Sequence, residues 1–197
     1  MKKRILEVAK KEFIEKGFTD ASMRSIAGAV GITATALYRH FGSKEEMFEA
    51  VVDLAVKDWE ILCDSESKRQ TSIGRNEGVE AMWGNNAQSG IIVNMIYKNF
   101  DEHKLLFFGS KGTKYEDFLH HIVTRVQKET LKFMDELKTK GITVNEVDEK
   151  NMHLLLSAQY TALLEMVKHD YSYDEALKYA EVVNIFFSEG WRKFLGF

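Results

Sequence analysis

Residues 22–47 read SMRSIAGAVGITATALYRHFGSKEEM, and this stretch decides how the amino-terminal part of the chain folds. Apolar residues recur at helical spacing over 23–30 and again over 34–41, and Gly31 separates the two segments. Glycine adopts the left-handed backbone of a tight helix end without a steric penalty. Two short helices joined by a tight glycine turn are typical of a helix-turn-helix, whose second helix enters the major groove of DNA.

Helical signals continue along the rest of the chain. Proline, which interrupts helix interiors, is absent from all 197 residues, and no stretch alternates polar and apolar residues for long enough to require a strand. Ser-x-x-Glu capping boxes at 43–46 and 172–175 mark two helix starts. We expect nine helices, at 3–16, 23–30, 34–41, 44–63, 79–100, 102–108, 115–137, 151–169 and 174–195. The sequence predicts an all-α protein, with a loop over 64–78 and a break at 109–113.

The second helix of the pair has a buried face and an outward face. At 100° per residue, Leu37 and Phe41 share the buried side with Thr33. The residues left pointing outward are Thr35, Ala36, Tyr38 and Arg39. Small Thr and Ala side chains allow close approach to base edges and thymine methyl groups, and an outward arginine reaches guanine acceptors or a phosphate.

Phosphate contacts are expected beside this face. Tyr38 and His40 can donate hydrogen bonds to phosphate oxygens, and Lys44 lies in the first turn of the next helix, where backbone amides also point at an anion. Tyr38 is alternatively a core residue of a three-helix module, and Ser22 and Ser43 are helix caps whatever else they contact.

Charge is divided unevenly along the chain. The net charge is −3, but residues 1–45 carry nine Lys/Arg against five Asp/Glu, a balance of +4, and the remainder carries 18 against 25, a balance of −7. A basic segment on an acidic body favours an anionic partner for the first segment. The alternative is ordinary fluctuation, because +4 is modest.

A longer pattern runs through the same region: Gly17-Phe18-x-x-x-Ser22-Met23-x-x-Ile26-Ala27-x-x-Val30-Gly31-Ile32-Thr33-x-x-x-Leu37-Tyr38-x-His40-Phe41-x-Ser43-Lys44-Glu45-x-Met47. It resembles the DNA-binding signature of the TetR family of bacterial transcriptional regulators. The resemblance implies a homodimer of all-helical subunits, with a helix-turn-helix DNA-binding domain at 1–45. It also implies a helical ligand-binding and dimerisation domain at 46–197, in which a small molecule releases the protein from a palindromic operator.

The resemblance also implies roles for individual residues. Ser22 and Arg24 would flank the groove, and Tyr38, His40 and Lys44 would contact phosphates. The residues that would approach the bases are Thr33, Ala34, Thr35 and Ala36. Many relatives have a Lys or Arg and then a Gly where this chain has Ala34 and Thr35, so the operator sequence is not carried over. Arg39 either compensates or is a solvated charge.

The carboxyl-terminal half predicts an interface and a ligand site. The helices expected at 151–169 and 174–195 are too apolar for burial on one side, which favours a dimeric four-helix bundle, although both could belong to the monomer core. Aromatic and methionine side chains accumulate over 56–135, and such linings suit ligand cavities and cores alike. The candidate ligand residues are Trp59, Trp83, Met95, Phe118 and His121.

Other classes of function find little support. Cys63 is the only cysteine, the adjacent His120 and His121 diverge on a helix, and no phosphate loop or nucleophile motif occurs, so we expect neither an enzyme nor a metal or cofactor. The basic start, residues 1–11, has no apolar run and is predicted to be helix instead of a signal peptide. The longest apolar stretches of the sequence are too short to cross a bilayer, so we expect a cytoplasmic protein. The alternative function is an adaptor whose helix-turn-helix binds a protein partner.

Overall fold

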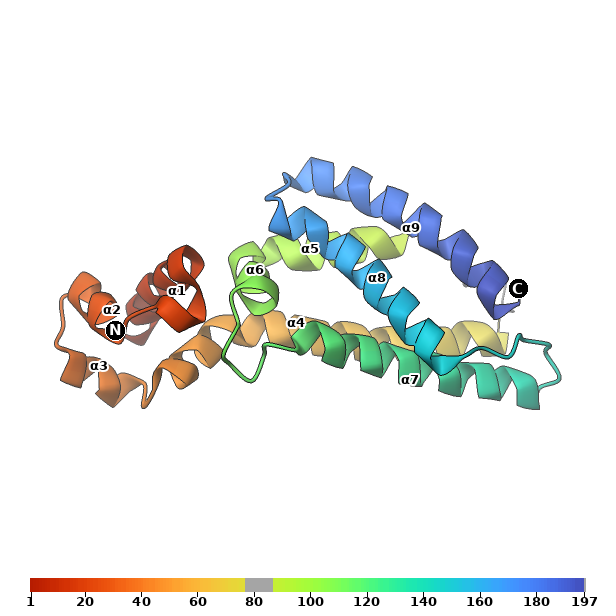
Figure 1. Cartoon of the computed structure of the whole chain (residues 1–197), viewed down its shortest axis with the longest axis horizontal. Helices are drawn as coiled ribbons and strands as arrows, with labels where there is room; N and C mark the ends of the chain where they lie inside the picture. Colours follow the sequence, from red (N-terminus) through yellow and green to blue (C-terminus); the bar gives the residue numbers. More distant parts are fainter. Residues whose placement is uncertain (77–86, 197) are drawn as a thin grey trace. The chain divides into compact units, whose positions relative to one another are not determined.

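The computed structural model describes residues 1–76 and 87–196, and the described residues form helices, turns and connecting segments without a strand (Figure 1). The helices in these ranges are α1 (Lys2–Asp20), α2 (Met23–Val30), α3 (Ala34–His40), α4 (Lys44–Asn76), α5 (Ala87–Lys98), α6 (Phe100–Phe108), α7 (Phe118–Thr139), α8 (Glu149–Lys168) and α9 (Tyr173–Leu195). The all-α prediction is confirmed.

The contacts within the chain define two compact units. The first unit comprises residues 1–58 and 98–118, and the second comprises 59–97 and 119–197. Helix α4 contributes residues to both units, and α6 belongs to the first. The functional boundary expected after residue 45 stays a prediction.

Three phenylalanine rings form the centre of the first unit. Phe13 and Phe18 of α1 both meet Phe48 of α4 edge to face, with ring centroids 5.1 and 5.4 Å apart. All three rings are buried. Such edge-to-face pairs add about 0.5–1.5 kcal/mol beyond the burial of their area. The cluster therefore joins the first helix to the start of α4.

Helix α1 bends at Gly17, where the sequence predicts that it ends. Gly17 has φ +70° and ψ 173°, which lies outside the helical region, and the chain resumes helical turns as far as Asp20. The N–H of Phe18 consequently donates to the carbonyl oxygen of Gly109 at 3.0 Å instead of closing an α1 turn. A side chain at position 17 would be strained at this φ, because the left-handed region favours glycine.

The prediction of a loop over 64–78 is wrong for residues 64–76, because these residues continue α4. Residues 77 and 78 lie outside the described residues. The polar side chains of this segment pair with neighbours instead of with solvent alone. Arg69 donates to Glu66 one turn away, and Ser67 donates to Glu129 of α7 at 2.8 Å. No glycine or proline occurs between residues 64 and 73, so nothing in the backbone ends the helix there.

The capping boxes are confirmed at one start and altered at the other. Ser172 and Glu175 exchange both reciprocal hydrogen bonds at the start of α9. At α4, the hydroxyl of Ser43 accepts from the N–H of Glu46 at 3.0 Å, but the Glu46 carboxylate accepts from the N–H of Gly42 at 2.7 Å. The second bond of this box therefore reaches one residue further back than the pattern predicts.

Helix α7 begins at Phe118, three residues later than expected. Side chains hold the preceding segment in turns, because the Ser110 hydroxyl donates to the carbonyl oxygen of Tyr115, and the Glu116 carboxylate accepts from the N–H of Gly112. The break expected at 109–113 is confirmed, and side-chain hydrogen bonds extend it to residue 117.

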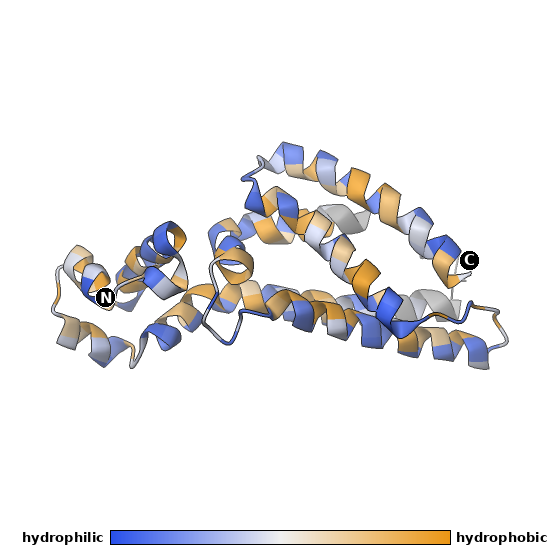
Figure 2. Ribbon diagram, in the orientation of Figure 1, coloured by the Kyte–Doolittle hydropathy of each residue, from blue (hydrophilic) through white to orange (hydrophobic). Residues whose placement is uncertain are grey.

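The core of the second unit joins α7, α8 and the end of α9. Its buried residues are Val123, Phe133, Met134, Leu137, Val144, Met152, Leu156 and Leu195. Figure 2 shows hydrophobic residues along much of α9. The side-chain amide of Asn145 donates to the carbonyl oxygens of Lys193 and Phe194, which ties the segment between α7 and α8 to the last turn of α9.

Candidate nucleic-acid interface

Local capping fixes the geometry of the α2–α3 pair. The hydroxyl of Ser22 accepts from the N–H of Ser25, and the hydroxyl of Thr33 accepts from the N–H of Ala36 at 3.1 Å. Gly31 ends α2 in the left-handed region, at φ +82°, and its N–H donates to carbonyl oxygens of the last turn. Ser22 and Thr33 are thus the N-caps of the two helices.

Helix α3 presents one face outward, largely as its spacing predicts. Leu37 is fully buried and Phe41 is 3% exposed, whereas Tyr38 is 50% exposed. Thr35 and Arg39 are exposed as well. The remaining residues of the expected interface on α3 are half-buried: Ala34, Ala36 and His40. Thus the outward face of α3 is made of small, hydroxyl-bearing and cationic side chains.

Two residues expected beside α3 need separate description. Thr33 is exposed, so its expected place on the buried side is wrong: it has the extended backbone of an N-cap (φ −75°, ψ 154°) and does not follow the helical rotation. Arg24 is exposed on α2, as is the N-cap Ser22. The structure therefore brings Ser22, Arg24 and the α3 residues into one helix-turn-helix, and their contacts with DNA stay predictions.

Lys44 has structural partners that the sequence does not reveal. Its ammonium group donates to the carbonyl oxygens of Phe18 (2.7 Å), Thr19 (3.0 Å) and Ala21 (3.2 Å). The same nitrogen lies 4.5 Å from the ring centroid of Phe18. An ammonium has three N–H donors, so these carbonyls occupy all of them. A phosphate contact would require Lys44 to give up at least one.

Glu12 is a second organising residue that sequence reasoning missed. Its two carboxylate oxygens accept from the N–H of Ser22 at 3.1 Å and the hydroxyl of Ser25 at 3.0 Å, and Lys16 pairs with it at 2.9 Å. Burial by itself raises the pKa of Glu12, but the hydrogen bonds from Lys16, Ser22 and Ser25 outweigh it and hold the pKa below its usual value. Glu12 therefore anchors the start of α2 to α1.

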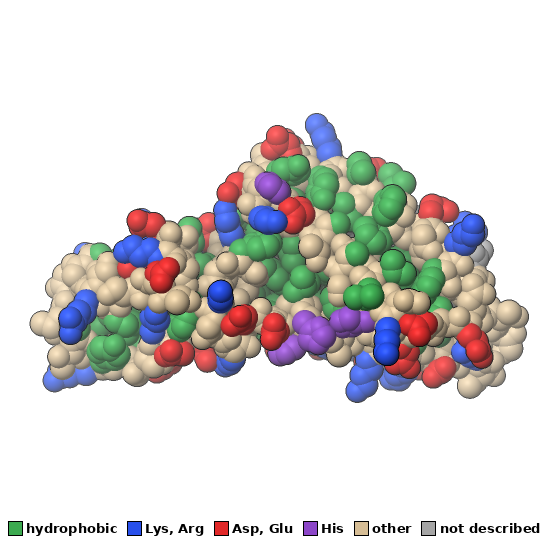
Figure 3. Space-filling model, viewed as in Figure 1, with side chains coloured by type: hydrophobic (Ala, Val, Ile, Leu, Met, Phe, Trp, Pro, Cys, Tyr) green, Lys and Arg blue, Asp and Glu red, His purple; other side chains and the backbone are tan. Residues whose placement is uncertain are grey.

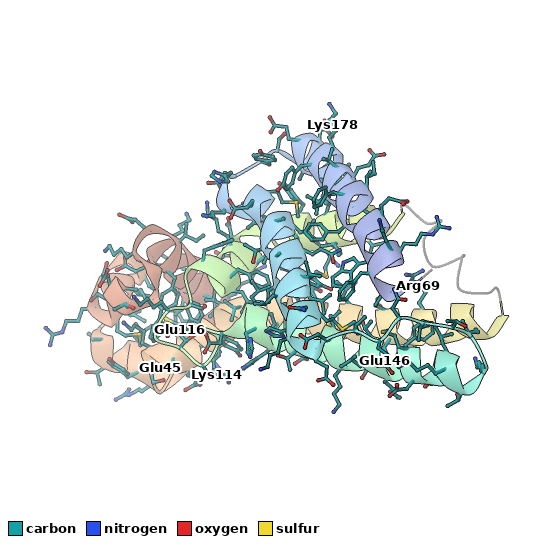
Figure 4. The ribbon with its side chains drawn as sticks, turned by 45° about the vertical axis from the view of Figure 1, so that its right-hand side comes forward. Glu45, Arg69, Lys114, Glu116, Glu146 and Lys178 are labelled. Atoms are coloured by element: carbon teal, nitrogen blue, oxygen red, sulfur yellow. The ribbon has the colours of Figure 1, made fainter. Side chains whose placement is uncertain are left out.

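Helix α6 and the segment after it are attached to the helix-turn-helix within the first unit. Lys10 of α1 pairs with Glu102 at 3.0 Å and with Asp101 at 3.6 Å. Beyond α6, the hydroxyl of Thr19 donates to the carbonyl oxygen of Lys111. Lys114, labelled in Figure 4, pairs with Glu49 of α4 at 2.9 Å. These contacts join α6 to α1 and the segment after α6 to α1 and α4, an attachment that no local pattern predicts.

His103 of α6 is fully buried, and its Nδ1 lies 2.9 Å from the carbonyl oxygen of Asn99. Nδ1 is therefore the donor, and Nε2 has no partner among the described residues. Burial lowers the pKa of His103, although the Asn99 carbonyl and the charges of Asp58 and Glu102 act in the opposite direction. The folded protein thus favours the neutral imidazole.

We expect acid to destabilise the protein partly through His103. In the unfolded chain, His103 binds a proton at an ordinary pKa of about 6.5. Above that pH, the neutral His103 makes its full contribution to the free energy of unfolding. This contribution is lost as the pH falls toward the lower folded pKa, by at most about 1.4 kcal/mol per pH unit. Urea unfolding between pH 7.5 and 5.5 should show a smaller loss in His103→Gln than in the wild type. The exposed His121→Gln is the control; an unchanged loss in His103→Gln would contradict the assignment.

The second unit contains a cavity of about 180 Å³. Its lining residues are Leu62, Cys63, Glu66, Ser67, Arg69, Ile92, Arg125, Val126, Glu129, Thr130, Phe133, Met134, Met152, Leu156, Gln159, Tyr160, Trp191 and Leu195. Helices α4, α7, α8 and α9 provide most of this lining. The volume of this cavity is sufficient for a small molecule.

None of the described residues expected to bind the ligand lines this cavity. Trp59 is fully buried and meets the ring of Tyr160, and Phe118 packs in the first unit with its ring 5.7 Å from that of Phe107. Met95 is half-buried and His121 is exposed. The fifth candidate, Trp83, lies outside the described residues. A ligand role for these residues stays a prediction that this cavity does not support.

An apolar surface lies on the last two helices. Val182, Ile185 and Phe186 of α9 are 63, 55 and 74% exposed, and Leu154 of α8 is 66% exposed. Figure 3 shows hydrophobic side chains gathered over α8 and α9 on one face of the molecule. The α9 residues follow helical spacing and form one stripe. Large exposed apolar patches of this kind mark interaction sites.

Two further kinds of feature, a membrane-spanning helix and a cluster of metal-binding side chains, are absent from residues 1–76 and 87–196. No helix there is long and apolar enough to cross a membrane. No group of three or more His, Cys, Asp or Glu side chains in these ranges could hold a metal ion.

The capped helix pair, with its buried Leu37 and outward Tyr38, defines an all-helical protein of the helix-turn-helix class. Residues 5–51 match the family model described as bacterial regulatory proteins, tetR family. Over 49 residues, the chain is 43% identical to the HTH-type transcriptional regulator UidR of Escherichia coli K12, which covers 25% of each chain. Over 72 residues, it is 36% identical to the HTH-type transcriptional repressor KstR2 of Rhodococcus jostii, covering 34% of this chain and 35% of that one.

The whole fold also has solved counterparts. The TetR family transcriptional regulator PfmR from Thermus thermophilus superposes with a TM-score of 0.58, at 24% identity, over 92% of this chain and 94% of that one. The matched region spans about a quarter of the length of UidR and about a third of KstR2. Residues 5–51 therefore match the TetR family model, and the chain shares its fold with a solved TetR family regulator.

Proposed function

We propose that the protein is a homodimeric transcriptional repressor that acts in the cytoplasm and is released from a palindromic operator by a small molecule. The observation that carries the proposal is the outward face of α3, where Tyr38 is half exposed on a helix whose other side is buried. A short, capped helix with such a face fits the major groove. The proposal makes the protein a binding protein and not an enzyme.

The residues of α2 and α3 expected at the interface, with their N-caps, each receive a role in the proposal. Thr35 and Ala36 approach base edges, and Arg39 reaches a guanine or a phosphate. Tyr38 and His40 donate to phosphate oxygens. The caps Ser22 and Thr33, together with Ala34 and Arg24, border this surface. The TetR family match and the exposed Arg24 and Arg39 favour DNA over a protein partner at this surface.

Dimerisation is assigned to the apolar surface on α8 and α9. A two-fold dimer places the same residues of both copies against each other, so the exposed α9 stripe would be covered by its own counterpart. Two copies of α8 and α9 would make a four-helix bundle. A symmetric dimer in turn requires a palindromic operator.

The ligand is proposed to act on the helix that contributes to both units. Helix α4 supplies Leu62, Glu66 and Arg69 to the cavity lining, and its first turns carry Met47 and Phe48 in the core of the first unit. A ligand that binds one position of α4 more tightly than another shifts the population of DNA-competent dimers. The separation of the two α3 helices is the quantity that this shift would change.

Removing the Tyr38 hydroxyl tests the DNA-binding role. We expect Tyr38→Phe to weaken binding to DNA from upstream of the protein's own gene by about fivefold, because a lost hydrogen bond costs about 1 kcal/mol. Fluorescence anisotropy at two salt concentrations, with scrambled DNA as competitor, measures both specificity and salt dependence. Tyr171→Phe is the control, since Tyr171 is 38% exposed and lies outside the helix-turn-helix. Equally weak binding to both DNAs, unaffected by Tyr38→Phe, would favour the adaptor alternative.

A further inference from the structure

The chemistry of the cavity in the second unit specifies the kind of ligand it takes. Its volume of about 180 Å³ is similar to that of an engineered apolar cavity of about 150 Å³ that binds benzene. One ring with a short substituent therefore fits without rearrangement. Every lining residue belongs to the second unit.

Much of the cavity wall is apolar. Phe133 and Met134 of α7 line it together with Met152 and Leu156 of α8 and Leu195 of α9. These five residues are buried and belong to the core of the second unit. Such a wall favours an apolar ligand body, because transfer of apolar surface out of water is favourable.

The charged groups of the lining are unequally paired. Arg69, labelled in Figure 4, donates to Glu66 through two nitrogens at 2.6 and 2.9 Å. Arg125 pairs with Asp64. Glu129 also lines the cavity, but its carboxylate accepts only the Ser67 hydroxyl, at 2.8 Å, and has no cationic partner among the described residues. With Asp64 counted, three carboxylates face two guanidinium groups, and Glu129 is the one in excess.

Two aromatic residues of the lining, Trp191 and Tyr160, also carry polar groups. The indole N–H of Trp191 donates to the side-chain oxygen of Gln159 at 2.7 Å. The hydroxyl of Tyr160 makes no hydrogen bond among the described residues. Burial, together with the charges of Cys63 and Glu66, raises the pKa of Tyr160, so it stays a neutral O–H group. The faces of aromatic rings attract a cation.

An anionic ligand fits this arrangement poorly. A carboxylate would compete with Glu66 for Arg69 and with Asp64 for Arg125, and it would lie beside the unpaired charge of Glu129. Like charges at short range are unfavourable, particularly where protein atoms replace water. An ammonium group meets the opposite situation, since it supplies the missing partner of Glu129.

We propose that the cavity takes a small lipophilic amine in its ammonium form, with its ring against the apolar wall and its charge paired with Glu129. The proposal rests on the proposed function in one respect: occupation of the cavity is expected to release DNA. The pairing with Glu129 is tested by binding alone.

The experiment compares three probes of one size: 2-phenylethylammonium, 2-phenylethanol and phenylacetate, each titrated into the full chain at pH 7 and followed by tryptophan fluorescence. We expect the ammonium to bind at least tenfold more tightly than the other two. Glu129→Gln keeps a hydrogen-bond acceptor for Ser67 but removes the charge, and we expect it to abolish the preference. Asp135→Asn makes the same charge change at an exposed position of α7 outside the cavity and should preserve it.

Several results would overturn the proposal: tighter or equal binding of phenylacetate, no binding of any probe to the wild type, or an unchanged preference in Glu129→Gln. The comparison of probes on the wild type needs no variant, so it decides even if Glu129→Gln folds poorly. Release of DNA is measured separately, by anisotropy with each probe. An ammonium that binds through Glu129 but leaves DNA bound would count against the proposed release mechanism and leave the ligand class standing.

Discussion

Phe186→Glu should convert the proposed dimer to a monomer and abolish specific DNA binding at nanomolar protein concentrations. Phe186 is 74% exposed on α9, beside Val182 and Ile185 in the same stripe. Burial of a phenylalanine contributes about 1.5–3 kcal/mol, and a two-fold interface buries it twice. Two introduced carboxylates near the symmetry axis add repulsion. We expect the dimer dissociation constant to rise at least about 1,000-fold, equivalent to about 4 kcal/mol.

Sedimentation equilibrium and DNA binding by anisotropy measure the two consequences of Phe186→Glu. Ile61→Glu is the matched control, because Ile61 is 65% exposed and belongs to α4 instead of α8 or α9. The control should stay dimeric and bind DNA. If Phe186→Glu were dimeric at nanomolar concentration, or if both variants dissociated alike, α8 and α9 would not be the interface.

The helix-turn-helix could be predicted from the sequence because its determinants are local. Ser22, Gly31 and Thr33 act on backbone groups within a few residues, and α2 is found at its predicted bounds. Helix α3 begins where predicted and ends one residue before the predicted end. The burial of Leu37 and Phe41 follows from helical rotation in the same way. Thr33 departs from this rule because an N-cap does not have helical backbone angles.

The extent of α4 and the cavity could not be predicted, because both depend on distant partners. The polar segment after Cys63 resembles a loop in composition, but Ser67 pairs with Glu129, which is 62 residues away in the sequence. Trp59 and Phe118, two of the candidate ligand residues, are buried and do not line this cavity, so their ligand role stays a prediction. The polar groups of the cavity become recognisable only when α4, α7 and α8 are placed together.

Lys44→Met should destabilise the protein by about 2–3 kcal/mol. The ammonium of Lys44 satisfies three carbonyl oxygens near the end of α1, those of Phe18, Thr19 and Ala21. Hydrogen bonds to charged groups contribute about 1.5–3 kcal/mol each. Lys44 is half-buried, so water can replace part of this, and the expected loss is closer to that of one bond than of three. Urea unfolding followed by circular dichroism measures the change.

The same variant separates the two roles that Lys44 could have. If it acts chiefly on the carbonyls, Lys44→Met lowers the unfolding free energy, and the folded variant keeps the wild-type dependence of DNA affinity on salt. If it acts chiefly on a phosphate, stability is unchanged and the slope of log affinity against log salt falls by about one. Lys11→Met, at an exposed position of α1, should change neither quantity appreciably. We expect the first outcome, because all three donors of Lys44 are already engaged within the protein.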